Sequence, residues 1–208
     1  MLPGPIRIIK APGCQNLLKV ETLLSGNTFE AIFWSDGKME APMLPDQPWL
    51  RKSPSEKVLF WMDEVEKVGE TYPGRKLKGK DEAWEALEFA KAPSEKNYFQ
   101  ALEAGLADSP KRLEYLRTRI WWKGNDPIRK KKRKELTARH RENLEALLEL
   151  NQGGDPGSRL TKAEILRELG RFEEAAEVIE GEFPDDCDWV LKFLRKWIGK
   201  REARVKKR

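Results

Sequence analysis

Residues 161–180 read TKAEILRELGRFEEAAEVIE, and this stretch decides how the second half of the chain folds. Apolar residues recur at helical spacing on both sides of a single glycine, Gly170. Glycine ends helices readily because it adopts the left-handed backbone conformation without a steric penalty. After it, Phe172 anchors the turn, and Ala175 is small enough for a second helix to cross the first closely. The stretch therefore predicts a helical hairpin.

The order of small, large, glycine and aromatic residues in this hairpin resembles that of tetratricopeptide-like repeats. The matching positions are Ala163, Leu166, Gly170, Phe172, Ala175 and Ile179. The resemblance covers about one hairpin of the 208 residues. It implies an array of stacked helical hairpins, and it specifies a packing unit rather than a ligand.

Four earlier segments carry helical periodicity and predict the rest of the array. They are residues 81–92, 94–106, 110–123 and 127–150. Ser94 and the pair Ser109–Pro110 are typical N-terminal caps for two of these helices. A last helix that begins near Asp188 would cover the open end of the array, which leaves residues 200–208 as a solvated tail.

The first 70 residues show the signals of short strands and tight turns instead. The dipeptide Asp36–Gly37 separates two runs of alternating polarity and predicts a β-hairpin, because primed turns need residues that tolerate positive φ. Residues 57–63, KVLFWMD, predict a further strand, and residues 63–69 predict a short helix.

A change of composition after residue 70 predicts a domain boundary. Residues 71–80 are rich in Gly and Lys and contain Pro73, as expected for a linker. We therefore expect an α+β protein with a small β-rich, ribbon-like module over residues 1–70. An α-helical tetratricopeptide-like domain would follow over residues 81–208 and end in a basic tail.

Two short motifs in the N-terminal module resemble the paired C-P-x-C turns of a zinc ribbon. They are APGC at residues 11–14 and SPSE at residues 53–56. A ribbon followed by tetratricopeptide-like helices resembles a group of bacterial proteins of unassigned function, in which four thiolates would bind zinc. Here the four ligand positions are Ala11, Cys14, Ser53 and Glu56. One thiolate and one carboxylate do not complete a closed tetrahedral site, so we expect a degenerate, metal-free ribbon. Binding of some metal through Cys14 alone stays open.

The composition is typical of a folded, soluble protein. Hydrophobic residues make up 39% of the chain and include 8 Trp and 8 Phe, which can supply a core. No apolar run of about 18 residues occurs, and the N-terminus lacks the apolar stretch of a secretory signal. The two cysteines, Cys14 and Cys187, are too few for a disulfide framework. We expect a cytoplasmic protein.

The sequence offers little for catalysis. His140 is the only histidine, so no histidine-dependent triad or histidine metal cluster can form, and its apolar neighbours predict a partly buried structural role. Residues 74–81, GRKLKGKD, match part of a phosphate loop, but Asp81 replaces the hydroxyl residue and no hydrophobic strand precedes the motif. We expect no enzyme activity, no cofactor and no bound metal.

The net charge of +5 is distributed in blocks. Residues 129–141 carry eight basic residues and one acid, and residues 192–208 carry nine basic residues and one acid. Between them, residues 142–191 carry fourteen acids and four basic residues. An acidic block between basic ones is unusual for a nucleic-acid binder, because acidic side chains repel phosphate.

These observations favour a non-catalytic protein–protein interaction or scaffold protein that uses a helical-hairpin groove and a metal-free ribbon. The alternative is a nucleic-acid-associated protein that binds the phosphate backbone through residues 129–141 and 192–208. Peripheral membrane contact through the last helix is a third alternative, and no small-molecule substrate is predicted. The residues expected to face a partner are Arg117, Trp122, Arg129, Lys130, Lys131, Lys132, Arg133, Trp197, Lys200, Arg201 and Arg204.

Overall fold

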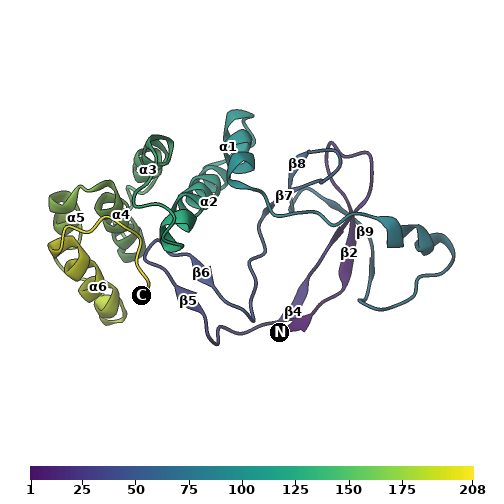
Figure 1. The fold of residues 1–208 in the computed structure, drawn as a ribbon, viewed down its shortest axis with the longest axis horizontal. Coiled ribbons are helices and arrows are strands. Elements are labelled where there is room, and N and C mark those ends of the chain that lie inside the picture. Colours follow the sequence, from purple (N-terminus) through teal and green to yellow (C-terminus); the bar gives the residue numbers. More distant parts are fainter. The chain divides into compact units, whose positions relative to one another are not determined.

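The computed structural model describes residues 1–79 and 81–208, and these divide into two compact units (Figure 1). The β unit comprises residues 1–31 and 40–97, and the helical unit comprises residues 32–39 and 98–208. Helices and small antiparallel sheets are both present, which confirms the α+β class. Within the described residues, no helix has both the length and the apolar character needed to cross a membrane.

The β unit is built from short antiparallel strands. They are β1 (Leu2–Pro3), β2 (Ile6–Lys10), β3 (Leu18–Val20), β4 (Leu23–Ser25), β7 (Leu50–Lys52), β8 (Leu59–Trp61) and β9 (Glu66–Thr71). β2 lies between β3 and β9 in a three-stranded sheet, β1 pairs with β4, and β7 pairs with β8. Ile9 of β2, Leu18 of β3 and Phe60 of β8 are buried together in a small core. The strand predicted over residues 57–63 is thus confirmed as β8.

Two predictions for this region are wrong. The short helix predicted over residues 63–69 is replaced by β9, which pairs along the whole length of β2. The predicted linker over residues 71–80 does not end the unit, because the chain returns to the sheet. Trp84 packs closely on Gly69 of β9, and a Cβ added at Gly69 would lie 2.4 Å from the Trp84 ring. The β unit extends to residue 97, beyond the linker predicted over residues 71–80.

The helix predicted over residues 81–92 is also largely absent. A 3₁₀ helix, η1 (Gly79–Ala86), is followed by extended chain that forms bridges from Phe89 to Lys19 and from Lys91 to Lys52. Hydrogen bonds to strands far away in the sequence therefore override the local helical preference of these residues.

The helical unit contains six α-helices, of which the first begins within the β unit. They are α1 (Glu95–Glu103), α2 (Pro110–Arg129), α3 (Ala138–Leu150), α4 (Pro156–Leu169), α5 (Phe172–Val178) and α6 (Asp188–Gly199), with a 3₁₀ turn η2 (Asp185–Cys187) before α6. The predicted caps are confirmed: Ser94 Oγ accepts from the Asn97 amide at 3.3 Å, and Ser109 Oγ accepts from the Arg112 amide at 3.3 Å. Gly170 ends α4 with φ of 83°.

The helix predicted over residues 127–150 is split differently in the structure. α2 continues through Pro127 to Arg129, the chain leaves the helical conformation, and α3 begins only after Thr137. Pro127 lies near the end of α2, where the loss of one backbone hydrogen bond is tolerated. Thr137 is the N-cap of α3, because its Oγ1 accepts from the His140 amide. The basic run therefore lies in the α2–α3 loop rather than in a helix.

The hairpin predicted at Asp36–Gly37 is confirmed, but it belongs to the helical unit. Its strands are β5 (Ile32–Phe33) and β6 (Met39–Glu40). Trp34 donates its amide proton to the Lys38 carbonyl at 2.9 Å, and Gly37 has φ of 79°. Figure 1 shows the C-terminus ending near this hairpin.

The predicted solvated tail is instead an ordered part of the helical unit. The amide of Ser35 donates to the Lys206 carbonyl and the amide of Arg208 donates to the Phe33 carbonyl, both at 2.8 Å. Val205 is buried in the same apolar core as α4 and α6. Backbone pairing with a segment far away in the sequence therefore removes most of the tail's freedom.

A close crossing of α2 and α3 explains one glycine in the helical unit. An added Cβ at Gly124 would lie 2.4 Å from the ring of His140, which is only 3% exposed. The imidazole is held by Thr137, whose Oγ1 lies 2.6 Å from Nδ1. Burial of His140 agrees with the structural role predicted for it.

We expect Gly124→Ala to destabilise the protein by about 1–3 kcal/mol, because overlap with a buried ring outweighs the better helix propensity of alanine. Gly199→Ala is the matched control, since Gly199 lies in α6 with no atom within 4 Å of the added Cβ. The control should change stability by no more than about 1 kcal/mol. Chemical denaturation of both variants measures the difference, and equal stabilities would contradict the proposed overlap.

Candidate functional site

The turn of the β5–β6 hairpin carries a buried carboxylate, Asp36, whose side chain is 0% exposed. It forms an ion pair with Arg129 at the end of α2, whose side chain is 3% exposed. Asn125 Nδ2 donates to the same carboxylate at 2.9 Å, and Trp122 Nε1 donates to the Asp36 carbonyl at 2.8 Å. Three consecutive turns of α2 therefore hold one residue of the hairpin.

A second buried layer of charged groups lies on α4. Trp121 Nε1 and Asn125 Nδ2 donate to the Glu168 carboxylate at 2.8 and 2.9 Å. Arg167 donates to Glu164 at 2.6 and 2.8 Å, and it also donates to the Arg204 carbonyl of the C-terminal tail at 3.1 Å. Asn125 thus joins the hairpin to α4, and Arg167 joins α4 to the tail.

Burial raises the pKa of Asp36, and the positive charge of Arg129 opposes this rise. Burial also raises the pKa of Glu168 well above its usual range, and the nearby carboxylates of Glu164 and Asp36 act in the same direction. Burial and neighbouring carboxylates thus both oppose a negative charge on Glu168, whereas Arg129 offsets the burial of Asp36.

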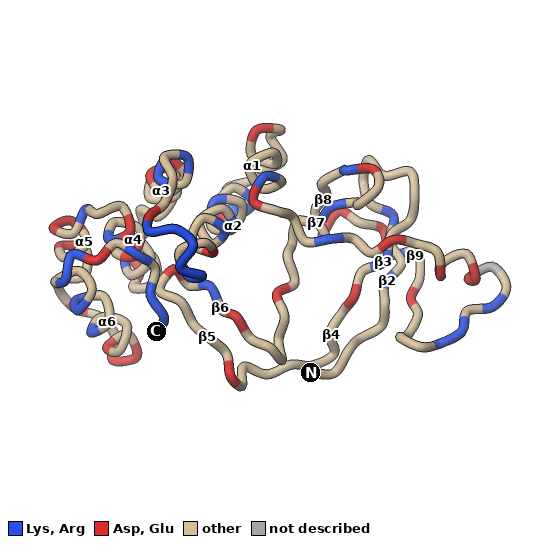
Figure 2. Tube along the Cα trace, viewed as in Figure 1, with Lys and Arg blue, Asp and Glu red and all other residues tan. Residues whose placement is uncertain are grey.

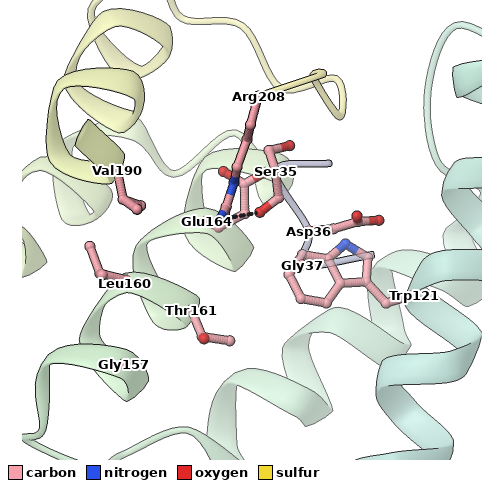
Figure 3. Close-up of a pocket in the computed structure, with 10 residues that line it drawn as sticks. All are labelled: Ser35, Asp36, Gly37, Trp121, Gly157, Leu160, Thr161, Glu164, Val190 and Arg208. Carbon is pink, nitrogen blue, oxygen red and sulfur yellow. Dashed lines mark hydrogen bonds between the residues drawn. The ribbon is translucent and has the colours of Figure 1, made fainter. Parts of the chain in front are cut away.

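A pocket of about 240 Å³ opens beside these groups (Figure 3). Its lining residues are Ser35, Asp36, Gly37, Trp121, Gly157, Leu160, Thr161, Glu164, Val190 and Arg208. Arg208 reaches into it and donates to the Ser35 carbonyl at 2.7 Å. Asp36 and Glu164 are already paired with Arg129 and Arg167, so both carboxylates on the pocket wall are neutralised within the helical unit.

We expect Asp36→Ala to lower the free energy of unfolding by about 3–5 kcal/mol, because it leaves the buried Arg129 charge without its carboxylate. Chemical denaturation monitored by circular dichroism measures the loss. Glu149→Ala, at an exposed position on α3, serves as the control and should change stability by less than about 0.5 kcal/mol. A loss for Asp36→Ala no larger than that of the control would show that the ion pair contributes little.

Three of the residues predicted to face a partner make contacts within the helical unit. Arg129 is buried against Asp36, and its guanidinium lies 5.2 Å from the centre of the Trp34 ring. Trp122 is half-buried and bonded to the hairpin. Arg117 is half-buried on α2, and its carbonyl accepts from Asn143 Nδ2 of α3 at 2.9 Å. These side chains are used in packing, because their partners come from segments that the local sequence does not show.

The predicted C-terminal residues lie at the surface but have neighbours. Arg201 pairs with Glu173, and Arg204 pairs with Glu202. Trp197 is half-buried and surrounded by the amino groups of Lys196, Lys200 and Lys206, which lie 5.1, 5.4 and 4.6 Å from its ring centre. This part of the surface is therefore partly neutralised and partly covered.

The α2–α3 loop is different. Its basic residues Lys130, Lys131, Lys132, Arg133 and Lys134 are all exposed. Among the described residues, none of these five side chains has an ion pair or a hydrogen bond. Figure 2 shows them as a continuous basic segment between α2 and α3. We call these five residues the basic loop. Among the predicted contact residues, Lys130 to Arg133 are exposed and, within the described part of the chain, have no ion-pair partner.

The two turns that resemble zinc knuckles lie side by side in the β unit. Cys14 donates its amide proton to the Ala11 carbonyl at 3.2 Å, and Gly13 has φ of 72°. The Glu56 carboxylate of the second turn accepts from the amides of Gln15 and Asn16 at 2.8 and 3.1 Å. Glu56 therefore bridges the first turn to the second through backbone hydrogen bonds.

Cys14 lies at the centre of this arrangement as a buried thiol. Burial raises its pKa, and the negative charge of Glu56 raises it further, so the thiol remains protonated near neutral pH. A protonated thiol is a poor metal ligand and a poor nucleophile. Among residues 1–79 and 81–208, no three His, Cys, Asp or Glu side chains gather closely enough to hold a metal ion.

Because Glu56 bridges the two turns as a carboxylate, the stability of the fold depends on pH. The backbone amides of Gln15 and Asn16 lower the pKa of Glu56 below its ordinary value of 4.5. A carboxylate whose pKa is lower in the folded state stabilises the fold above pH 4.5, and this stability is lost as the pH falls through the folded pKa.

We therefore expect the wild type to be more stable than Glu56→Gln at neutral pH, and the difference to shrink as the pH falls below 4.5. Thermal denaturation over this pH range measures both proteins. Glu21→Gln, at an exposed position outside the two turns, controls for the change of net charge. A gap between wild type and Glu56→Gln that is the same at every pH would rule out the bridge.

Sequence reasoning missed the buried polar cluster. Asp36 was recognised only as a turn residue, because nothing near it in the sequence indicates Arg129, which lies 93 positions away. The role of Asn125 could not be predicted either, since its hydrogen-bond partners belong to the hairpin and to α4. A basic residue within a run of basic residues gives no sign that it alone is buried.

The chain matches no protein-family model, no curated protein and no solved structure.

Proposed function

We propose that the protein is a non-catalytic interaction protein whose helical unit binds an acidic protein partner through the basic loop. The observation that carries this proposal is the exposure of five consecutive basic side chains without ion-pair partners among the described residues. Other arginines of the unit are neutralised within the fold, as Arg129 is by Asp36 and Arg171 is by Glu174. The basic loop is therefore a run of adjacent, exposed positive charges that the fold does not neutralise.

The ends of the basic loop are fixed, which favours binding. Arg129 anchors the start of the loop through its buried ion pair, and Leu136 is buried in the core just before α3 begins. A loop with both ends held loses less conformational entropy on binding than a free tail would. Complementary charge then increases the rate and the specificity of association.

The shape of the unit adds a second feature consistent with protein binding. A groove of about 240 Å³ lies between α3, α4 and α5, and Leu148, Leu166 and Val178 contribute apolar surface to it. Its rim carries Lys162 and Glu177. A groove between stacked helices is the usual binding surface of tetratricopeptide-like arrays, and the resemblance of α4 and α5 to such a hairpin belongs to the same proposal.

Binding to nucleic acid is the second candidate, because the same basic loop could contact successive phosphates. We favour a protein partner because acidic residues lie on the neighbouring helix. Glu142 and Glu149 follow the loop on α3, and both are exposed. A phosphate backbone that extends beyond the loop would meet these carboxylates and be repelled.

We expect the triple variant Lys131→Gln, Lys132→Gln, Arg133→Gln to lose its protein partner in an affinity pull-down that the wild type retains after nuclease treatment. The variant Arg75→Gln, Lys76→Gln, Lys78→Gln is the matched control, because it removes the same charge from exposed positions in the β unit. Mass spectrometry of the bound proteins measures the loss. The three substitutions lie in an exposed loop, so both variants should fold.

The outcomes separate the two candidates. A partner that resists nuclease, is lost with the loop variant and is kept by the control supports the protein-binding proposal. Binding that disappears with nuclease, and falls steeply between about 50 and about 200 mM salt, supports nucleic acid instead. Equal capture by the loop variant and the wild type would contradict both candidates.

A further inference from the structure

A second cationic site lies in the β unit, where a pocket of about 600 Å³ opens beside the turn at residues 53–57. Its lining residues are Lys52, Pro54, Ser55, Lys57, Glu88, Lys91, Ala92, Ser94 and Asn97. All of them belong to the β unit, and they come from two segments of the chain, residues 52–57 and 88–97. The volume is within the range of pockets that bind small organic ligands.

Two of its lysines are held directly opposite each other. Lys52 of β7 and Lys91 form an antiparallel bridge in which each amide donates to the other's carbonyl, at 3.0 and 2.9 Å. Like charges at directly opposite positions in an antiparallel pair repel each other and are destabilising. An anion between the two amino groups would remove this repulsion.

A third amino group, that of Lys57, completes the cationic side of the pocket. Its Nζ donates to the neutral Pro54 carbonyl, so its charge is not compensated by that contact. Among the described residues, no carboxylate forms an ion pair with Lys52, Lys57 or Lys91. Three positive charges therefore line one pocket without acidic partners.

The single acid on the pocket wall is occupied elsewhere. Glu88 Oε2 accepts from the Ser55 amide at 3.2 Å, which fixes the turn against the segment that carries Lys91. One carboxylate against three amino groups leaves the pocket cationic. Glu88 would repel a bound anion, so its removal should increase the affinity for one.

Two neutral polar residues complete the lining, and Ser94 donates both its amide and its hydroxyl proton to Asn97 Oδ1. Ser94 precedes α1, and Asn97 lies in the first turn of that helix, where Ser94 and Asn97 are bonded to each other at 2.8 Å. The start of a helix adds positive potential to a site that the lysines already make cationic.

We propose that this pocket binds a phosphate group, either free or as the monoester of a small organic molecule. A phosphate dianion accepts hydrogen bonds from several donors at once, and lysine binds it as a mobile point charge. The three amino groups would neutralise it, and the remaining volume would accommodate the group that carries the phosphate. This site lies in the other unit from the basic loop and does not depend on the proposed function.

Titration of the ¹⁵N-labelled full chain at low ionic strength tests the proposal, with inorganic phosphate, adenosine monophosphate and adenosine as separate probes. We expect saturable chemical-shift changes at the amides of Ser55, Ser94 and Asn97 with the first two probes and none with adenosine. Sodium chloride at matched ionic strength controls for general screening. Equal affinity for phosphate and adenosine monophosphate would mean that the phosphate alone is recognised, and tighter binding of the monophosphate would mean that its carrier also contacts the pocket.

Variants make the assignment specific. Lys52→Gln with Lys91→Gln should weaken the binding of either phosphate probe by about tenfold or more, whereas Lys76→Gln with Lys78→Gln should leave it unchanged. Glu88→Gln should bind severalfold more tightly, and a damaged fold could not produce such a gain. The proposal is overturned if neither phosphate probe saturates, if adenosine binds equally well, or if the two double variants lose the same affinity.

Discussion

The helical unit depends on the buried ion pair between Asp36 and Arg129. Both side chains are almost completely removed from water, so each needs the other to avoid a large desolvation cost. The pair fastens a hairpin from the first fifth of the chain to the end of α2. Asn125 then extends the contact to Glu168 on α4, and Arg167 on the same helix reaches the C-terminal tail. One carboxylate therefore lies at the point where four segments meet.

Ion pairs within the fold also determine which positive charges remain uncompensated at the surface. Internal partners neutralise Arg129, Arg167 and Arg171, and the acidic residues near the last helix neutralise Arg201 and Arg204. The basic loop, which follows immediately after Arg129, has no such partners among the described residues. The fold thus divides one continuous basic run into a buried structural residue, Arg129, and the exposed residues of the basic loop.

Local signals predicted the local features well. The turn at Asp36–Gly37, the cap at Ser109 and the helix end at Gly170 all appear as expected, because each depends on the conformational preference of a few adjacent residues. Predictions failed where distant pairing decides the structure. Residues 66–71 form a strand because they pair with β2. The basic tail is ordered because it forms backbone hydrogen bonds with the β5–β6 hairpin.

The candidate site shows the same division. Exposure of Lys130 to Arg133 could be predicted from composition, whereas burial of Arg129 could not, since its partner Asp36 is revealed only by the fold. The cationic pocket was also missed, because Lys52 and Lys91 are brought together by a single bridge between segments 39 positions apart.

Pairing between the hairpin and the tail has a consequence for how the chain is made. Ser35 and Lys206 are joined across 171 positions, so the hairpin leaves the ribosome long before the segment that completes its edge. Contacts of such wide separation form late and slow the approach to the native state. During translation, the helices will already be available for packing before residues 205–208 can pair with the hairpin.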